Sequence, residues 1–251
     1  MMSEIVALHS SQSHGGQWRN LTKSLIKEGL HLRSPDLIGY GQQAQFNGDA
    51  NGFRFNQEIA HLAQLGMNPL EWRDTLLVGH SYGGALALHI ALQHPASVRG
   101  LVLYEPVSFH VLPQQHVARA EIIKVADAMG SMSQADACRH FVDYWNVPGY
   151  FDRLPEKARQ LMVAQQAKVT ADFEALLMQS TALNDYGNVD CPVTLFVGDE
   201  SPQSSRTVAQ LLASTLPNVS MHFVPAGHMG PLTHTKQVTP ELHQAILSLQ
   251  A

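Results

Sequence analysis

The sequence predicts an α/β fold with a mostly parallel sheet of about six strands and an all-helical insertion. Three observations lead to this prediction. Over roughly the first hundred residues, short apolar runs alternate with longer helical patterns, the rhythm of a parallel sheet covered on both faces. Between about residues 106 and 187 only helical patterns occur, and strands return afterwards. A Gly-x-Ser-x-Gly sequence lies where a strand pattern gives way to a helix pattern.

The first strand and the first two helices follow from apolar spacing. The continuous apolar run 5–8 is typical of a strand buried on both faces. Trp18, Leu21 and Leu25 recur at helical spacing, which predicts a helix over 18–29. A stretch that changes from polar to apolar residues then ends at residue 36. Apolar residues at helical spacing next predict a helix over 53–66.

The later core elements flank the serine turn and resume after the insertion. A strand is expected at 76–78, then a helix over 83–94 that Pro95 stops, then a strand at 101–104. Near the end of the chain we expect a strand at 193–197, a helix at 204–216, a strand at 220–224 and a helix at 236–249.

The helical insertion predicts a two-part organisation. Four helical patterns fall at about 114–129, 134–145, 155–167 and 171–180. The simplest interpretation is a core made of residues 1–105 and 188–251, interrupted by a helical cap over 106–187.

Composition excludes several classes of protein. The chain has 251 residues, of which 45% are hydrophobic and 15% charged, enough apolar side chain for a sizeable core. The net charge is −5 and no basic run occurs, so neither nucleic acid nor an anionic membrane is an expected partner. The uncharged stretch from Thr75 to Val98 is long enough to span a bilayer, but a buried strand, a glycine-rich turn and a half-buried helix explain its polar residues better.

Cysteine and histidine usage point to a metal-free cytoplasmic protein. Two cysteines, Cys138 and Cys191, are too few for a disulfide framework and suit a reducing cytosol. The N-terminus has neither the basic start nor the apolar stretch of a signal peptide. None of the 14 histidines has a spacing that argues for metal ligation.

Ser81 is the strongest candidate for a reactive side chain. It lies in Val78-Gly79-His80-Ser81-Tyr82-Gly83-Gly84, between a predicted strand and a predicted helix. Such a turn is so tight that its flanking positions need glycine, and it lifts the serine hydroxyl above the sheet edge. The helix that begins there directs backbone N–H groups at the same point, which favours developing negative charge. The sequence therefore predicts a nucleophile elbow.

Over nearly its whole length the chain resembles the α/β-hydrolase family. The resemblance rests on five motifs in a fixed order, each weak by itself: Leu8-His9-Ser10-Ser11, Asp36-Leu37-Ile38-Gly39-Tyr40-Gly41, the elbow around Ser81, Val197-Gly198-Asp199-Glu200-Ser201-Pro202, and Gly227-His228-Met229-Gly230. It implies a serine nucleophile, a histidine base late in the sequence, an acid that orients the histidine, and no cofactor. Members normally carry a β-hairpin before the first of these strands, but only four residues precede Ile5 here. We therefore expect a sheet of six strands that lacks this N-terminal hairpin.

By this resemblance His228 is the base and two backbone N–H groups form the oxyanion hole. A serine hydroxyl needs a nearby imidazole to take its proton. One oxyanion donor is the N–H of Tyr82, directly after the nucleophile. The other falls on Ser11, and here Ser10 replaces the glycine that the family usually has before this donor.

The acid is the least regular part of the pattern. Family members usually carry it where this chain has Ser201, which cannot be charged at neutral pH. Glu105 ends the predicted strand 101–104, and some members place the acid at this strand end. A carboxylate directly after four apolar strand residues is also costly to bury without a partner. We therefore favour Glu105 over Asp199, with Glu200 as a further alternative.

The insertion supplies apolar side chains for a pocket over Ser81, among which Phe109 and Trp145 are the proposed substrate contacts. The expected function is hydrolysis of a small, uncharged ester or related acyl compound through an acyl-enzyme. Carbon–carbon bond hydrolysis, lactonase and thioesterase activity on the same residues stay open, as does a ligand-binding receptor with weak hydrolase activity. Ser81 argues against the dehalogenases and epoxide hydrolases, since both use an aspartate nucleophile.

Overall fold

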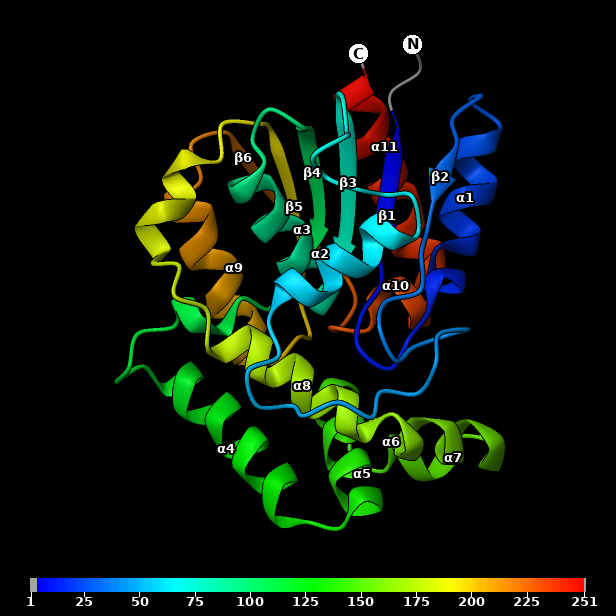
Figure 1. Ribbon diagram of the computed structural model, residues 1–251, viewed down its shortest axis with the longest axis vertical. Coiled ribbons are helices and arrows are strands. Elements are labelled where there is room, and N and C mark those ends of the chain that lie inside the picture. Colours follow the sequence, from blue (N-terminus) through cyan, green and yellow to red (C-terminus); the bar gives the residue numbers. More distant parts are fainter. Residues whose placement is uncertain (1–3, 251) are drawn as a thin grey trace.

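Six parallel strands form one sheet in the computed structural model, which describes residues 4–250 (Figure 1). The sheet order is β2-β1-β3-β4-β5-β6, and every pair of neighbours is parallel. The strands are β1 (Ile5–Leu8), β2 (Leu32–Arg33), β3 (Thr75–His80), β4 (Val98–Tyr104), β5 (Val193–Gly198) and β6 (Val219–Val224). The predicted fold class is thus confirmed.

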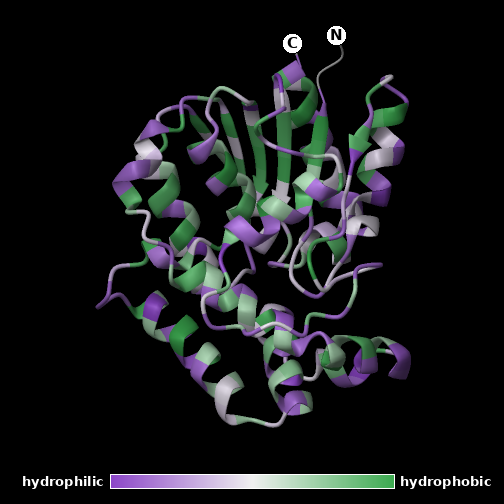
Figure 2. Ribbon diagram, viewed as in Figure 1, coloured by the Kyte–Doolittle hydropathy of each residue, from purple (hydrophilic) through white to green (hydrophobic). Residues whose placement is uncertain are grey.

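Helices cover both faces of the sheet because its strands are apolar on both sides. Side chains of β1 alternate between two buried clusters: Ile5 and Ala7 join one, while Val6 and Leu8 join the other. On the first face lie α1 (Arg19–Ile26) and α11 (Thr235–Gln250), and on the second lie α2 (Phe55–Gln64), α3 (Tyr82–Gln93) and α9 (Gln203–Thr215). Figure 2 shows the hydrophobic central strands between helices that carry both polar and apolar residues.

The strand order fixes where a ligand can bind. From β1 the chain crosses to β2 on one side and then to β3 on the other, so the topology reverses between β1 and β3. In open α/β sheets this reversal leaves a crevice at the carboxyl ends of the two strands. Ser11 follows β1 and Ser81 follows β3, which brings two of the predicted site residues to that crevice.

Between β4 and β5 the described chain forms only helices. After a 3-10 turn at Phe109–Val111 come α4 (Val117–Ser131), α5 (Gln134–Trp145), α6 (Tyr150–Arg153), α7 (Glu156–Ala164) and α8 (Gln166–Leu177), followed by a second 3-10 segment at Leu183–Asn188. In Figure 1 the five α-helices lie across the carboxyl-terminal edge of the sheet. We refer to α4–α8 as the inserted helices.

The inserted helices differ from the sequence expectation in two main respects: α6 was not predicted, and the boundary between α7 and α8 lies elsewhere. The predicted helices 155–167 and 171–180 instead meet at Gln165, and α8 runs unbroken through residues 168–170. Lys168, in the expected gap between the two helices, lies inside α8 and is completely buried. Tertiary contacts, and not helical periodicity, thus decide where α7 ends.

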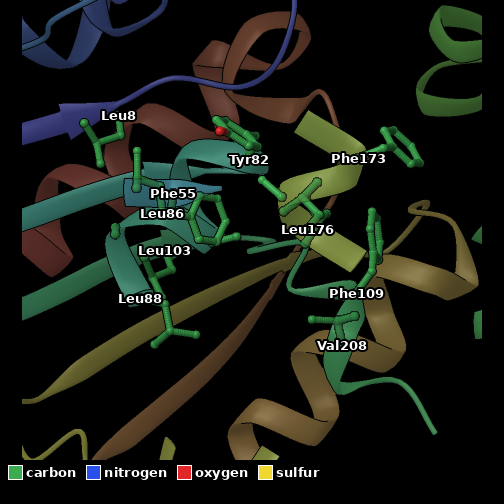
Figure 3. Packing of buried hydrophobic residues seen from close by; sticks show 14 of the residues in the cluster. Leu8, Phe55, Tyr82, Leu86, Leu88, Leu103, Phe109, Phe173, Leu176 and Val208 are labelled. Carbon is green, nitrogen blue, oxygen red and sulfur yellow. The ribbon is translucent and has the colours of Figure 1, made fainter. Parts of the chain in front are cut away.

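The inserted helices share one apolar cluster with the core. Figure 3 shows Leu8, Phe55 and Tyr82 of the core packing in the same cluster as Phe173 and Leu176 of α8. Shared burial of this kind, worth roughly 25 cal/mol per Å² of apolar surface, holds the inserted helices on the core.

Within residues 4–250 no helix is both long enough and apolar enough to cross a membrane. The uncharged stretch Thr75–Val98 folds as β3, the serine turn and α3, as the sequence suggested, except that α3 is almost wholly buried and not half-buried.

Candidate active site

Ser81 occupies a strained turn between β3 and α3. Its φ of 56° and ψ of −121° lie where side chains are rare, at a cost of roughly 1–3 kcal/mol. Backbone hydrogen bonds maintain the turn: Ser81 N–H donates to the Tyr104 carbonyl at 3.0 Å, and Ala85 N–H donates to the Ser81 carbonyl at 2.9 Å. The flanking glycines are required by space, because a Cβ on Gly79 would lie 2.5 Å from the Gly84 Cα and one on Gly83 would lie 2.4 Å from the Leu8 carbonyl oxygen.

His228 and Glu105 complete a hydrogen-bonded chain with Ser81. His228 Nε2 lies 2.9 Å from Ser81 Oγ, and His228 Nδ1 lies 2.6 Å from Glu105 Oε2. Both side chains are buried, at 1% and 0% exposure. Because a carboxylate only accepts hydrogen bonds, Nδ1 carries the imidazole proton and Nε2 is free to accept the serine O–H. This is the tautomer that a base acting on Ser81 requires.

Glu105 is held from two sides. Its other oxygen, Oε1, accepts the Gly198 N–H from the end of β5 at 2.7 Å. Its φ of 44° is left-handed, which turns the side chain off the end of β4 toward His228. By contrast Asp199 and Glu200 are exposed on the loop after β5, and Ser201 is buried beside them. Of the carboxylates considered from the sequence, the structure brings Glu105 to His228.

Two further histidines support the site as neutral groups. The ring of His80 donates from Nε2 to the His228 carbonyl at 2.8 Å, and burial together with nearby His228 holds the pKa of His80 well below its usual value. His9 accepts the Leu37 N–H on Nε2 at 2.9 Å and donates from Nδ1 to the Ser10 carbonyl at 2.8 Å. Burial lowers the pKa of His9 to about 4. Both rings therefore hold the loops of the site in place through hydrogen bonds and add no charge at neutral pH.

These neutral histidines make the fold sensitive to acid. The folded-state pKa of His9 is about 4 against 6.5 for the ordinary group, so between these pH values the unfolded chain binds more protons. We expect the free energy of unfolding to be level above roughly pH 7 and to fall below roughly pH 6.5, by up to about 1.4 kcal/mol per pH unit for each such histidine. Urea unfolding measured from neutral pH downward checks this. The slope should be shallower in His9→Gln and unchanged in His31→Gln, which alters an exposed histidine; equal slopes in wild type and His9→Gln would contradict it.

The predicted oxyanion residues flank Ser81. Tyr82 begins α3, and Ser11 lines the same cavity as Ser81 and His228. Ser10, in the position of the family's usual glycine, does not have a positive φ; the left-handed residue of this loop is Gln12, at φ 54°. Gln12 is held by a hydrogen bond from its Nε2 to the Met162 carbonyl of α7, at 2.9 Å. Because Ser10 itself does not need a left-handed backbone, a serine is tolerated at position 10.

A cavity of about 270 Å³ lies over Ser81. The inserted helices, together with Met229 and Leu232 after β6, supply its apolar wall, and the loop after β1 supplies most of its polar side. None of the described residues that line it is Asp, Glu, Lys or Arg. The lining residues are Ser10, Ser11, Gln12, Ser13, His14, Ser81, Phe141, Val142, Trp145, Asn146, Tyr150, Leu154, Met162, His228, Met229, Leu232 and Thr233.

Of the two predicted pocket residues, only Trp145 lines the cavity. Its indole lies on the His228 imidazole, with ring centroids 4.0 Å apart. Phe109 does not line it, which corrects the sequence expectation: it is fully buried behind Trp145, with ring centroids 6.2 Å apart, and also contacts Phe173. Apolar residues of an insertion can face either a cavity or the core, and periodicity does not distinguish the two.

Sequence reasoning missed a buried ionic cluster beneath the site. Lys168 of α8 pairs with Asp172 of the same helix and with Glu58 of α2, and all three side chains are fully buried. A Lys and an Asp four residues apart on a helix ordinarily form an exposed pair, so the pattern gave no reason to expect burial. Within residues 4–250, no group of three or more His, Cys, Asp or Glu side chains is arranged to hold a metal ion.

Comparison with known proteins agrees with the fold described above. A family model described as "Alpha/beta hydrolase family" matches residues 5–241. A haloalkane dehalogenase of Mesorhizobium japonicum is 33% identical over 117 residues, which are 44% of this chain and only 36% of that enzyme. A pimeloyl-acyl-carrier-protein methyl ester esterase of Chromobacterium violaceum is 26% identical over 92% of this chain and 89% of its own length.

The fold recurs in a solved structure. A thermophilic esterase from Thermogutta terrifontis superimposes with a TM-score of 0.73, covering 99% of this chain and 91% of that one, at 21% sequence identity. At that identity the likeness concerns the fold.

Proposed function

The chain belongs to the α/β-hydrolase family, and from this premise we propose that it is a serine hydrolase that cleaves a small ester or related acyl compound. The observation that carries the proposal is the hydrogen-bonded chain from Ser81 through His228 to Glu105, at the floor of a cavity without charged lining residues.

The proposed reaction proceeds through an acyl-enzyme. Ser81 Oγ attacks the substrate carbonyl while His228 Nε2 takes its proton, and Glu105 stabilises the imidazolium that forms. The N–H groups of Ser11 and Tyr82 hold the oxyanion of the tetrahedral intermediate. His228 then returns the proton to the leaving group. In the second half, His228 takes a proton from water, the water attacks the acyl-enzyme carbonyl, and Ser81 leaves with the proton that His228 returns, which releases the acid.

The substrate class follows from the cavity. An ionised substrate would lose its hydration there without gaining an opposite charge, so an uncharged, largely apolar acyl group is favoured. We propose that residues 106–187 act as the cap over the site. We also propose a reducing, cytoplasmic setting, since Cys138 and Cys191 are both unpaired.

A substrate panel tests the proposal. The purified protein should hydrolyse nitrophenyl esters of short or medium chain length, and comparison with thioesters, lactones and vinylogous diketones ranks the alternative bonds. A fluorophosphonate probe, which phosphonylates activated serines, separates an enzyme from a receptor: an enzyme reacts rapidly at Ser81, and a receptor that has lost activation reacts slowly. Absence of both hydrolysis and labelling would refute the serine hydrolase.

Acyl-chain preference should respond to Trp145 and not to Phe109. Truncating Trp145 enlarges the cavity and removes a contact with His228, whereas truncating Phe109 leaves a void behind the wall. We expect Trp145→Ala to raise the ratio of kcat/KM for octanoate to that for acetate esters by about tenfold or more. The ratio cancels any common loss caused by the missing His228 contact.

Phe109→Ala is the matched control for this experiment. It should leave the ratio unchanged while lowering the free energy of unfolding by about 3–5 kcal/mol, as for other buried phenylalanines. A changed ratio in Phe109→Ala, or an unchanged one in Trp145→Ala, would contradict the assignment of the two residues.

A further inference from the structure

The buried ionic cluster is unusual because three charged side chains are completely shielded from solvent. Lys168 Nζ lies 2.8 Å from Glu58 Oε1 and also pairs with Asp172, and all three side chains are 0% exposed. Burying an ion costs several kcal/mol even after relaxation, and apolar residues of similar volume are often as stable. Stability alone therefore does not explain the cluster.

The two carboxylates also bind the side chains of both residues of the proposed oxyanion hole. Asp172 Oδ2 accepts the Ser11 hydroxyl at 2.6 Å. Glu58 Oε1 accepts the Tyr82 hydroxyl in a longer contact of 3.3 Å. Because Lys168 bridges the two carboxylates, the side chains of Ser11 and Tyr82 are joined through one buried network that spans α2, α3 and α8.

The network also fixes the loops around it. Asp172 Oδ2 accepts a second hydroxyl, that of Tyr40, at 2.6 Å, and Glu58 Oε2 accepts the Ile38 N–H at 3.1 Å. The Lys168 ammonium lies 5.0 Å from the centroid of the Tyr40 ring. With these contacts, all four carboxylate oxygens of Glu58 and Asp172 have donors.

Ser11 is the part of the hole that most needs such support. It precedes Gln12, whose left-handed φ of 54° persists only if surrounding contacts impose it. Two of those contacts come from the inserted helices: the Gln12 bond to Met162 of α7 and the Ser11 bond to Asp172 of α8. An oxyanion donor must lie close to the position of the developing charge, so a small loop movement costs rate.

We propose that Asp172, whose charge is balanced by Lys168, is a positioning residue that holds the Ser11 backbone N–H in place for oxyanion binding. The oxyanion hole is then complete only while α8 is packed on the core. The inference rests on the proposed serine-hydrolase function and assigns to the inserted helices a part in catalysis besides covering the substrate.

Two variants test the tether from its two ends. Ser11→Ala deletes the hydroxyl and keeps the N–H. Asp172→Ala deletes the carboxylate that accepts the Ser11 hydroxyl and leaves Lys168 paired with Glu58. Full loss of an oxyanion donor costs about 10²–10³ in kcat, so a displaced donor should cost about 10–100-fold. We expect that loss in kcat, with a much smaller change in KM, because the ground-state carbonyl makes little use of the hole.

The same variants are measured by the rate of fluorophosphonate labelling at Ser81, which passes through an anionic transition state and requires no natural substrate. The double variant Ser11→Ala/Asp172→Ala should be no slower than the slower single variant, because both changes break one tether. Additive losses would overturn the proposal by showing that the Ser11 hydroxyl acts independently of Asp172.

Two matched controls separate positioning from stability. Tyr40→Phe deletes the other hydroxyl bound to Asp172 Oδ2, at the same 2.6 Å, but Tyr40 supplies no oxyanion donor. Glu174→Gln alters an acidic residue of the same helix that pairs with Arg54 at the surface, at 2.9 Å. Both should keep the labelling rate near that of wild type, even where thermal unfolding shifts. Equal rate losses in Ser11→Ala and Tyr40→Phe would make the cluster purely structural and overturn the proposal.

Failure of this inference is distinguishable from failure of the proposed function. If wild type is labelled and both Ser11→Ala and Asp172→Ala are labelled as fast as wild type, the positioning role is wrong and the serine hydrolase stands. If wild type is not labelled at all, Ser81 is not an activated nucleophile and both proposals fall.

Discussion

Ser81→Ala should abolish turnover while leaving the fold intact. The substitution removes the one oxygen that His228 Nε2 contacts at 2.9 Å, so no nucleophile remains at the floor of the cavity. Loss of a serine nucleophile from comparable triads costs about 10⁴–10⁶ in rate. Steady-state kcat on the best nitrophenyl ester measures the effect, and thermal unfolding verifies that the variant is folded.

Another buried serine provides the control for this experiment. Ser205 of α9 donates its hydroxyl to the Pro202 carbonyl at 3.1 Å and does not line the cavity over Ser81. Ser205→Ala should keep wild-type activity. A Ser81→Ala variant that retained most esterase activity would exclude the serine mechanism.

Glu105→Gln should lower kcat by about 10³–10⁴. The Gly198 N–H donates to Oε1, so in the variant the amide oxygen stays there and the NH₂ group faces His228 Nδ1. That NH₂ group donates, which forces the imidazole proton onto Nε2, where it can no longer accept the Ser81 hydroxyl. In a serine protease, the corresponding change from carboxylate to amide costs about 10⁴ through the same wrong tautomer.

Asp199→Asn is the paired measurement, since Asp199 was the alternative acid. Its side chain is exposed on the loop after β5, so we expect near-wild-type kcat. Near-full activity in Glu105→Gln together with a large loss in Asp199→Asn would reverse the assignment. Comparable losses in both variants would mean that neither carboxylate alone orients His228.

Much of the fold was accessible from local sequence patterns. Continuous apolar runs such as 5–8 are strands because only burial on both faces suits them, and the observed β1 is Ile5–Leu8. The predicted helix 134–145 has the bounds of α5 because Ser133 caps it and Asn146 ends it. The predicted gap between helices at 168–170 was wrong, because these residues lie inside α8, where the side chain of Lys168 is buried.

The sequence by itself determined the fold class, the family and the candidate residues Ser81, His228 and Glu105, because glycine spacing, strand ends and motif order are local properties of the chain. Their catalytic roles stay predictions. Only the tertiary structure decided that Glu105, and not Asp199, contacts His228, since that contact joins residues 123 positions apart through sheet order and a left-handed backbone at the end of β4. It likewise placed Trp145 on the cavity and Phe109 behind it, and it buried Lys168 with two carboxylates. Each of these depends on which side chains share a low-dielectric interior, a property of packing that no spacing along the chain specifies.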